Sequence, residues 1–264
     1  MNIRLHDGPL AELKCDSVFV PLVGGAKLGE RAETLVSRLR QSGEITGKHG
    51  ELTIIHEPND LAASRLILMG VGKTFDADQA FRMAGQALRA AQKRKFKSLV
   101  FALNDGDLVR SVTEGCVYGR YEPPKYKSDE VASTVEEIII IAPGAEQSDL
   151  ETGIIVGESV NLTRRLVDTP ANDLGPEEFA EIAESMGIAA GLKVEVLDEA
   201  SLETLGAGSL LSVAKGSARP PRLVRLDWNP TEVVNDSHLF LVGKGVTFDT
   251  GGISLKPANS MEKM

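Results

Sequence analysis

The chain has 264 residues, of which 42% are hydrophobic and 25% charged, as in ordinary globular proteins of one or two domains. Its formal net charge of −9 disfavours nucleic acid as the main partner, because phosphate binding needs concentrated lysine and arginine. Cys15 and Cys116 form no metal-binding spacing and fit the reduced thiols of a cytoplasmic protein, and no apolar run reaches the ~18 residues that cross a membrane.

The first 145 residues alternate between short apolar runs, which predict strands, and longer stretches with one apolar side, which predict helices. The predicted strands are 16–23, 52–56, 65–71, 98–103 and 136–142, and the predicted helices are 30–41, 76–95 and 109–121. Because continuous apolar runs separated by helices are typical of buried parallel strands, we expect a mostly parallel sheet covered on both faces. The polar, proline-containing stretch 123–129 predicts an exposed loop.

A long helix is predicted to link this part to the rest of the chain. The pattern Ser148-x-x-Glu151 is a capping box that favours a helix start, and the helix must end before Pro170. Further helices are predicted at 177–186 and 199–205, and further strands at 193–197, 210–213, 222–226 and 239–242. We therefore expect an N-terminal α/β domain at 1–145, a linking helix at 146–170, and the start of a second α/β domain at 171–264.

The stretch 241–257 combines four glycines with three charged side chains. An apolar run at 238–242 leads into it and predicts a buried strand. Charged residues placed where a buried strand opens into a glycine-rich loop are a common way to build a site in α/β proteins. Asp249 offers hard oxygen ligands for a divalent metal. Lys244 lies five residues earlier, and an odd separation places two side chains on opposite faces of a straight strand. If both residues serve one site, the backbone must therefore bend between them, and Gly245 is the obvious place.

The two lysines of this stretch are suited to different chemistry. A lysine binds a metal only as the neutral amine, and burial and a neighbouring cation both lower its pKa, so a dinuclear site could hold Lys244 deprotonated. Lys256 could remain an ammonium ion that stabilises a developing oxyanion. A surface loop with ordinary charges is the alternative interpretation, since lysine is an unusual ligand beside histidine, cysteine and carboxylates.

Two other glycine-containing motifs fail the tests for nucleotide binding. The segment 70–74, Gly-Val-Gly-Lys-Thr, has the tail of a phosphate-binding loop, but the required glycine five residues before Gly72 is Ile67. We therefore interpret it as a strand followed by a glycine turn. Gly243-x-Gly245 begins a dinucleotide fingerprint, but its third glycine position is Phe248.

Three segments of the chain are similar to those of the leucyl (cytosol) aminopeptidases, the M17 dinuclear metallopeptidases. They are VGKGVTFDTGGISLKP at 242–257, NLTRRLVDTPAND at 161–173, and LSVAKGS at 211–217 followed by PPRLV at 220–224, and they occur in the family's order. The resemblance implies an N-terminal macro-like α/β domain followed by the first part of a larger α/β metallopeptidase catalytic domain. It also implies a metal-dependent aminopeptidase that releases N-terminal amino acids, leucine favoured, from peptides.

The same resemblance implies roles for three residues and for two divalent ions, which would be manganese, zinc or magnesium. The residue matching Lys244 binds one metal, the residue matching Asp249 bridges both, and the residue matching Lys256 is a catalytic electrophile. The family assembles as hexamers, so a homo-oligomer is implied, together with a cytoplasmic location and no role for a membrane.

The chain departs from the family pattern after 261–264, where the family continues with a further metal aspartate and a later Asp-x-Glu-Gly-Arg segment. We therefore expect this chain to be the N-terminal half of such an enzyme and to have no appreciable turnover alone. The alternative hypothesis, from a different functional class, is a non-catalytic α/β binding or regulatory module, or an inactive truncated product.

Overall fold

The computed structural model describes residues 1–123, 134–232 and 237–261. Most of the loop predicted at 123–129 thus lies outside the described residues. The chain divides into two compact units, Met1–Arg165 and Leu166–Met264. In the described ranges no helix is long and apolar enough to cross a membrane.

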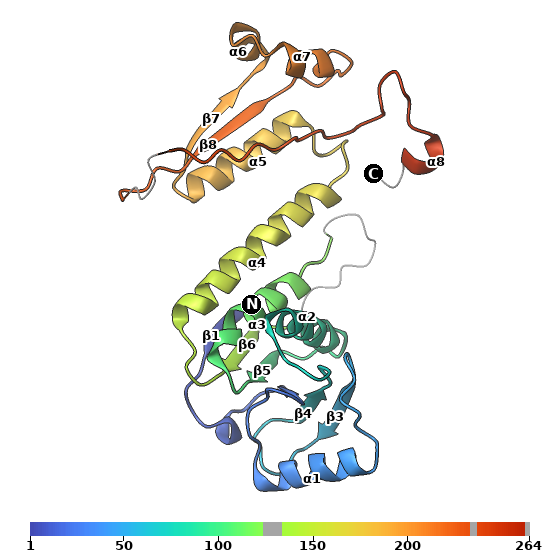
Figure 1. Cartoon of the computed structure of the whole chain (residues 1–264), viewed down its shortest axis with the longest axis vertical. Helices are drawn as coiled ribbons and strands as arrows, with labels where there is room; N and C mark the ends of the chain where they lie inside the picture. Colours follow the sequence, from blue (N-terminus) through green and yellow to red (C-terminus); the bar gives the residue numbers. More distant parts are fainter. Residues whose placement is uncertain (124–133, 233–236, 262–264) are drawn as a thin grey trace. The chain divides into compact units, whose positions relative to one another are not determined.

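A six-stranded sheet forms the centre of the first unit (Figure 1). Its strands are β1 (Asn2–Leu5), β2 (Ser17–Pro21), β3 (Leu52–His56), β4 (Arg65–Met69), β5 (Ser98–Ala102) and β6 (Glu137–Ile141). They lie in the order β1-β6-β5-β2-β4-β3, and every neighbouring pair is parallel except β3 and β4. The predicted mostly parallel α/β sheet is confirmed, although β1 was not predicted.

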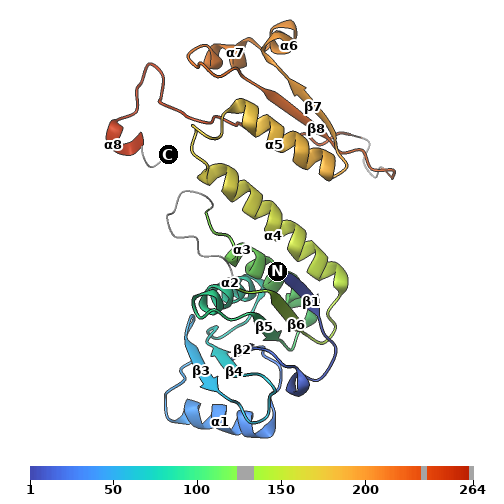
Figure 2. The same ribbon diagram turned by 180° about the vertical axis from the view of Figure 1, so that it is seen from behind.

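Helices cover both faces of this sheet. They are α1 (Glu30–Gln41), α2 (Ala77–Lys93), α3 (Val109–Gly119) and α4 (Gln147–Asp168), with short 3₁₀ helices η1 (Leu10–Glu12) and η2 (Gly106–Leu108). Alternate residues of each buried strand enter two different cores, as the two-residue period of a strand requires. Phe19 and Phe101 pack with α2 and α3, whereas Val18 and Val100 pack with α1. Figures 1 and 2 show α1 on the opposite side of the sheet from α2 and α3.

The start of α4 differs from the prediction. The helix begins at Gln147, so Ser148 lies inside it and does not cap it. The Ser148 hydroxyl donates to the carboxylate of Glu146 at 3.2 Å, and the backbone N–H groups of Asp149 and Leu150 donate to the Glu146 carbonyl. The predicted capping box is therefore wrong, because the chain enters the helical conformation before Ser148.

The second unit contains a two-stranded antiparallel sheet with one helix packed on a face of it. The elements are α5 (Pro176–Ala189), β7 (Lys193–Leu197), α6 (Glu199–Thr204), α7 (Gly208–Ala214), β8 (Leu223–Asp227) and α8 (Ala258–Met261). A Cβ added at Gly187 of α5 would lie 2.7 Å from Val194 and 2.9 Å from Leu226, so the helix approaches both strands closely there.

Two predicted strands of this unit are wrong. Residues 210–213 form part of α7, in which the N–H of Leu211 donates to the carbonyl of Ala207 and that of Lys215 to Leu211. A short apolar run fits a helix as well as a strand, and here local helical hydrogen bonds form. Residues 239–242 pair with no strand in the described ranges, and their exposed fractions run from 80% to 96%. An apolar run becomes a buried strand only if a neighbouring strand accepts its hydrogen bonds.

Candidate active site

Two lysine side chains of the glycine-rich stretch approach one carboxylate, that of Asp249. The Nζ atom of Lys256 lies 3.3 Å from Oδ2 of Asp249, and Nζ of Lys244 lies 3.9 Å from the same oxygen. The side chain of Lys256 is the least exposed of the three, at 30%, against 48% for Asp249 and 76% for Lys244. The structure thus brings together the three residues on which the sequence prediction of a site rests.

A tight turn after Asp249 makes this convergence possible. The backbone N–H of Gly251 donates to Oδ1 of Asp249 at 2.9 Å, and the N–H of Lys256 donates to the carbonyl of Thr250 at 2.9 Å. Gly251 has a φ of +94°, and a Cβ there would lie 2.3 Å from the carbonyl oxygen of Ser254. Only glycine fits such a position, so Gly251 allows the chain to return Lys256 to the carboxylate.

The turn itself was missed at the level of sequence, although a signal for it exists. Asp249-Thr250-Gly251 is a short Asx-type pattern, in which an aspartate accepts a hydrogen bond from the N–H two residues later. That pattern identifies Thr250 and Gly251 as supports of Asp249. The bend between Lys244 and Asp249 passes Gly245, where an added Cβ would lie 4.0 Å from the ring of Phe179 in α5.

The surroundings of Asp249 favour its ionised form. The hydrogen bond from the Gly251 N–H is the main cause that lowers the pKa of Asp249, followed by the hydrogen bond and charge of Lys256 and then by the charge of Lys244. Two cations and one backbone dipole thus stabilise a single exposed carboxylate. A divalent cation would meet an anion that is already formed at neutral pH.

Asp249 and Lys244 could supply part of the ligand set of a metal centre. Asp249 provides two carboxylate oxygens, which suit hard divalent ions, and Lys244 provides one nitrogen once it has lost its proton. A pair of divalent ions needs more ligands than these. Among the described residues there is no group of three or more histidine, cysteine, aspartate or glutamate side chains that could hold a metal ion.

Comparison with known families matches both units of the chain. The N-terminal domain of the cytosol aminopeptidase family matches residues 17–130, and the catalytic domain of the same family matches residues 161–264. The second match contains Lys244, Asp249 and Lys256, so the converging side chains lie in the part of the chain that corresponds to the catalytic domain.

Curated relatives agree with this match. The probable cytosol aminopeptidases of Solibacter usitatus and Rhodococcus jostii are each 38% identical to the chain, over 274 and 230 residues respectively. The alignments cover 100% and 83% of this chain but 56% and 45% of the relatives. The chain therefore spans about half the length of the curated relatives it matches.

Two solved structures are similar in fold to this chain. The bottromycin maturation enzyme BotP in complex with Mn is 30% identical with a TM-score of 0.75, over 93% of this chain and 51% of that one. A mutant of tomato leucine aminopeptidase has a TM-score of 0.81 over 95% of this chain and 55% of that one. Its sequence identity is 23%, so this similarity concerns the fold alone. The chain belongs to the cytosol aminopeptidase family, of which it carries the N-terminal domain and part of the catalytic domain.

Proposed function

We propose that the protein is a metal-dependent aminopeptidase that releases N-terminal amino acids, leucine favoured, from peptides in the cytoplasm. One observation carries this proposal: Lys244 and Lys256 approach the same carboxylate oxygen of Asp249, at 3.9 and 3.3 Å, inside the segment that matches the family's catalytic domain. The related structure of BotP in complex with Mn supports a divalent metal as the cofactor.

Asp249 and Lys244 would hold two divalent ions, of manganese, zinc or magnesium. Such ions supply a water of lowered pKa and stabilise negative charge on the reacting carbonyl. Asp249 would hold the ions through its carboxylate, one oxygen of which accepts a hydrogen bond from the N–H of Gly251 at 2.9 Å. Lys244 would bind one ion through its side-chain nitrogen, which lies 3.9 Å from Oδ2 of Asp249.

Lys256 would act directly on the substrate. Its side chain is the least exposed of the three, and its backbone N–H is fixed to Thr250. As an ammonium ion it has three donors, so it can hydrogen-bond Asp249 and also donate to the oxyanion that develops on the scissile carbonyl. A donor already positioned before the reaction needs little reorganisation as the negative charge appears.

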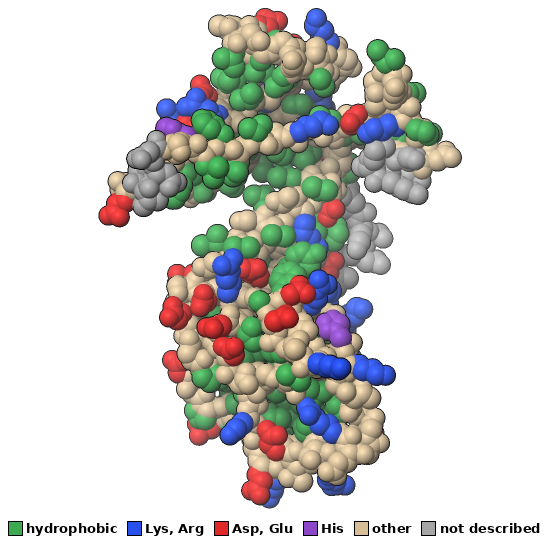
Figure 3. Space-filling view, in the orientation of Figure 1, with side chains coloured by type: hydrophobic (Ala, Val, Ile, Leu, Met, Phe, Trp, Pro, Cys, Tyr) green, Lys and Arg blue, Asp and Glu red, His purple; other side chains and the backbone are tan. Residues whose placement is uncertain are grey.

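We also propose that further acidic ligands and further subunits complete the enzyme. One carboxylate cannot saturate two ions, so the 264-residue chain alone should show no appreciable turnover. The second unit exposes large apolar side chains that suit burial against other protein, among them Ile188 at 64%, Val213 at 73% and Trp228 at 75%. Apolar side chains are visible on one face of this unit in Figure 3. A homo-oligomer, hexameric as in the family, would cover such a surface.

Removal and return of metal test the proposed function. The complete protein, expressed from its own gene, is dialysed against a chelator and assayed for hydrolysis of leucine amide. We expect activity to disappear and to return with manganese, zinc or magnesium. The N-acetylated substrate is the matched control and should not be cleaved, because an aminopeptidase requires a free α-amine. Full activity in chelator, or equal cleavage of the acetylated substrate, would contradict the proposal.

A further inference from the structure

A cavity of about 460 Å³ opens where β2 and β4 of the first unit end. Leu22 and Val23 line it after β2, Gly72 and Lys73 line it after β4, and the other walls are Arg40 of α1 and residues 45–48 before β3. The chain leaves β2 for α1 on one face of the sheet and leaves β4 for α2 on the other. Neighbouring connections that diverge in this way create the crevice in which open α/β sheets bind ligands.

The walls of the cavity are held in place by hydrogen bonds between its loops. The N–H of Gly72 donates to the carbonyl of Gly47 at 3.0 Å. The carboxylate of Glu51 accepts hydrogen bonds from the N–H groups of Thr46 and Gly47. Gly72 has a φ of +86°, which glycine adopts without strain and which turns the chain from β4 toward Lys73. The cavity is thus largely formed before any ligand enters, as is usual for small-molecule sites.

The charged side chains that line this cavity are all cations. Arg40, Lys48 and Lys73 line it, and no aspartate or glutamate does. In the parts of the chain that the structure describes, none of these three cations pairs with a carboxylate, and Arg40 donates one N–H to the carbonyl of Leu22 at 2.8 Å. Its guanidinium keeps further donors for another acceptor. On a chain of net charge −9, such a set of cations attracts anions locally.

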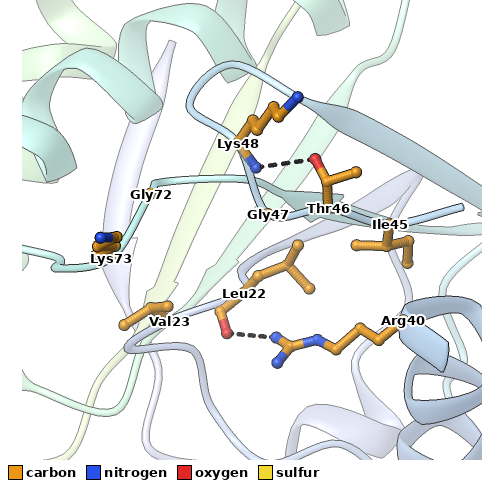
Figure 4. A pocket seen from close by; sticks show the side chains of 9 residues that line it. All are labelled: Leu22, Val23, Arg40, Ile45, Thr46, Gly47, Lys48, Gly72 and Lys73. Carbon is orange, nitrogen blue, oxygen red and sulfur yellow. Dashed lines mark hydrogen bonds between the residues drawn. The ribbon is translucent and has the colours of Figure 1, made fainter. Parts of the chain in front are cut away.

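The side chains are arranged with cations around an apolar centre. Figure 4 shows Arg40 and Lys73 on opposite sides of the Leu22–Val23 segment, with the ammonium group of Lys48 directed away from them. Ile45, which is 4% exposed, adds apolar surface to the wall formed by Leu22 and Val23. An occupant that carries both an anionic group and an apolar or planar part would match this lining.

We propose that this cavity binds a small organic phosphate. Arg40 holds the phosphate on its side of the Leu22–Val23 segment (Figure 4), because the planar fork of arginine suits a phosphate, and Lys73 and Lys48 add positive charge at the rim. The apolar part of the ligand lies against Leu22, Val23 and Ile45. This site belongs to the first unit and is independent of the proposed peptidase activity.

The mode of binding differs from that of a phosphate-binding loop. After Gly72 and Lys73 the chain does not enter a helix until Ala77, and the side chain of Asp76 already caps that helix by accepting from the N–H of Gln79. No free helix N-terminus therefore faces the cavity from α2. Side chains, rather than a row of backbone N–H groups, have to supply the charge, so their removal should weaken binding directly.

Calorimetric titration of the 264-residue chain with adenosine monophosphate tests the site, because this probe has both a phosphate and a planar apolar part. Inorganic phosphate and adenosine serve as the two half-probes. We expect a Kd of about 1 mM or below for the nucleotide and weaker binding of either half alone. Arg40→Gln and Lys73→Gln should each raise this Kd by about fivefold or more, whereas Lys73→Arg should keep it within about twofold. Lys93→Gln, which removes the same charge at the far end of α2, should leave the Kd unchanged.

Backbone amide shifts of the unaltered chain give a second readout that does not depend on the folding of variants. The amides of Val23, Gly47 and Gly72 should move on addition of the nucleotide. Equal binding of adenosine and its monophosphate, or equal weakening by Lys93→Gln and Lys73→Gln, would overturn the proposal. Absence of any shift at the cavity amides at about 5 mM nucleotide would also overturn it. Tighter binding of a single-stranded oligonucleotide, with shifts spread beyond the cavity, would replace it with a nucleic-acid surface.

Discussion

Single side chains decide the chemistry of both proposed sites, a carboxylate and two lysines in the second unit and a set of cations in the first. The sequence showed that Lys244 and Asp249 could serve one site only if the backbone bends between them. The turn at Gly251 returns Lys256 to the carboxylate, and it depends on a positive φ that the Asp-x-Gly pattern permits but does not fix. Arg40 and Lys73 were not predicted as a pair, because they lie 33 positions apart and only the sheet order brings them together.

Acid should weaken the first unit through Glu51. The N–H of Thr46 is the main cause that lowers the pKa of this carboxyl, with further hydrogen bonds from Thr46, Gly47 and Lys48. A lowered folded-state pKa means stability that is present above the unfolded value of about 4.3 and is lost as the pH falls through the folded value. Thermal unfolding between neutral and acidic pH should show Glu51→Gln less stable than the parent at neutral pH, with the difference shrinking in acid. A difference that grows in acid would contradict this account.

Arg164 should stabilise the join between α3 and α4. Its guanidinium lies 4.1 Å from the ring centres of both Tyr118 and Tyr121, and it donates to the carbonyl of Tyr118 at 2.9 Å. Lysine cannot stack flat between two rings, so Arg164→Lys should lower the free energy of unfolding by about 1–2 kcal/mol. Chemical denaturation measures the change, with Arg38→Lys on the exposed side of α1 as the control. Equal effects of the two substitutions would show that the rings contribute nothing.

Whole elements were predicted well where a strand is buried on both faces. The runs that form β2, β4, β5 and β6 are continuous and apolar because helices cover both sides of them. β1 was missed because it is a short edge strand whose polar residues, Asn2 and Arg4, break the apolar run. The run 239–242 was predicted as a strand from composition alone, but a strand also needs a partner, which composition does not reveal.

Helices α3 and α4 pack closely against each other at Gly153. A Cβ at Gly153 would lie 2.7 Å from Cβ of Thr113 and 2.8 Å from the carbonyl oxygen of Arg110. The backbone must shift to admit it, so Gly153→Ala should destabilise the first unit by about 1–2 kcal/mol despite the better helix propensity of alanine. Ser159→Ala places alanine on the exposed side of the same helix and should be neutral or stabilising. A stabilising Gly153→Ala in denaturant unfolding would refute the close packing.

At the scale of the whole molecule, the two units differ in how fully they bury their large apolar side chains. The first unit has two continuous cores, one on each face of its sheet, and its large apolar side chains are mostly buried. The second unit leaves Trp228 and the run 239–242 largely exposed, which suits a surface that other protein covers. Family membership could be inferred from the motifs, because three of them occur in the family's order.

The most direct measurement is kcat/KM for leucine amide hydrolysis by the complete protein and its Lys256→Ala variant. If Lys256 donates to the developing oxyanion, the variant should lose about 100-fold or more in kcat/KM, with most of the loss in kcat. Lys215→Ala, which removes an exposed lysine from the same unit, is the control and should retain the parent value. An unchanged kcat/KM for Lys256→Ala would contradict the assignment of Lys256 as the group that acts on the substrate.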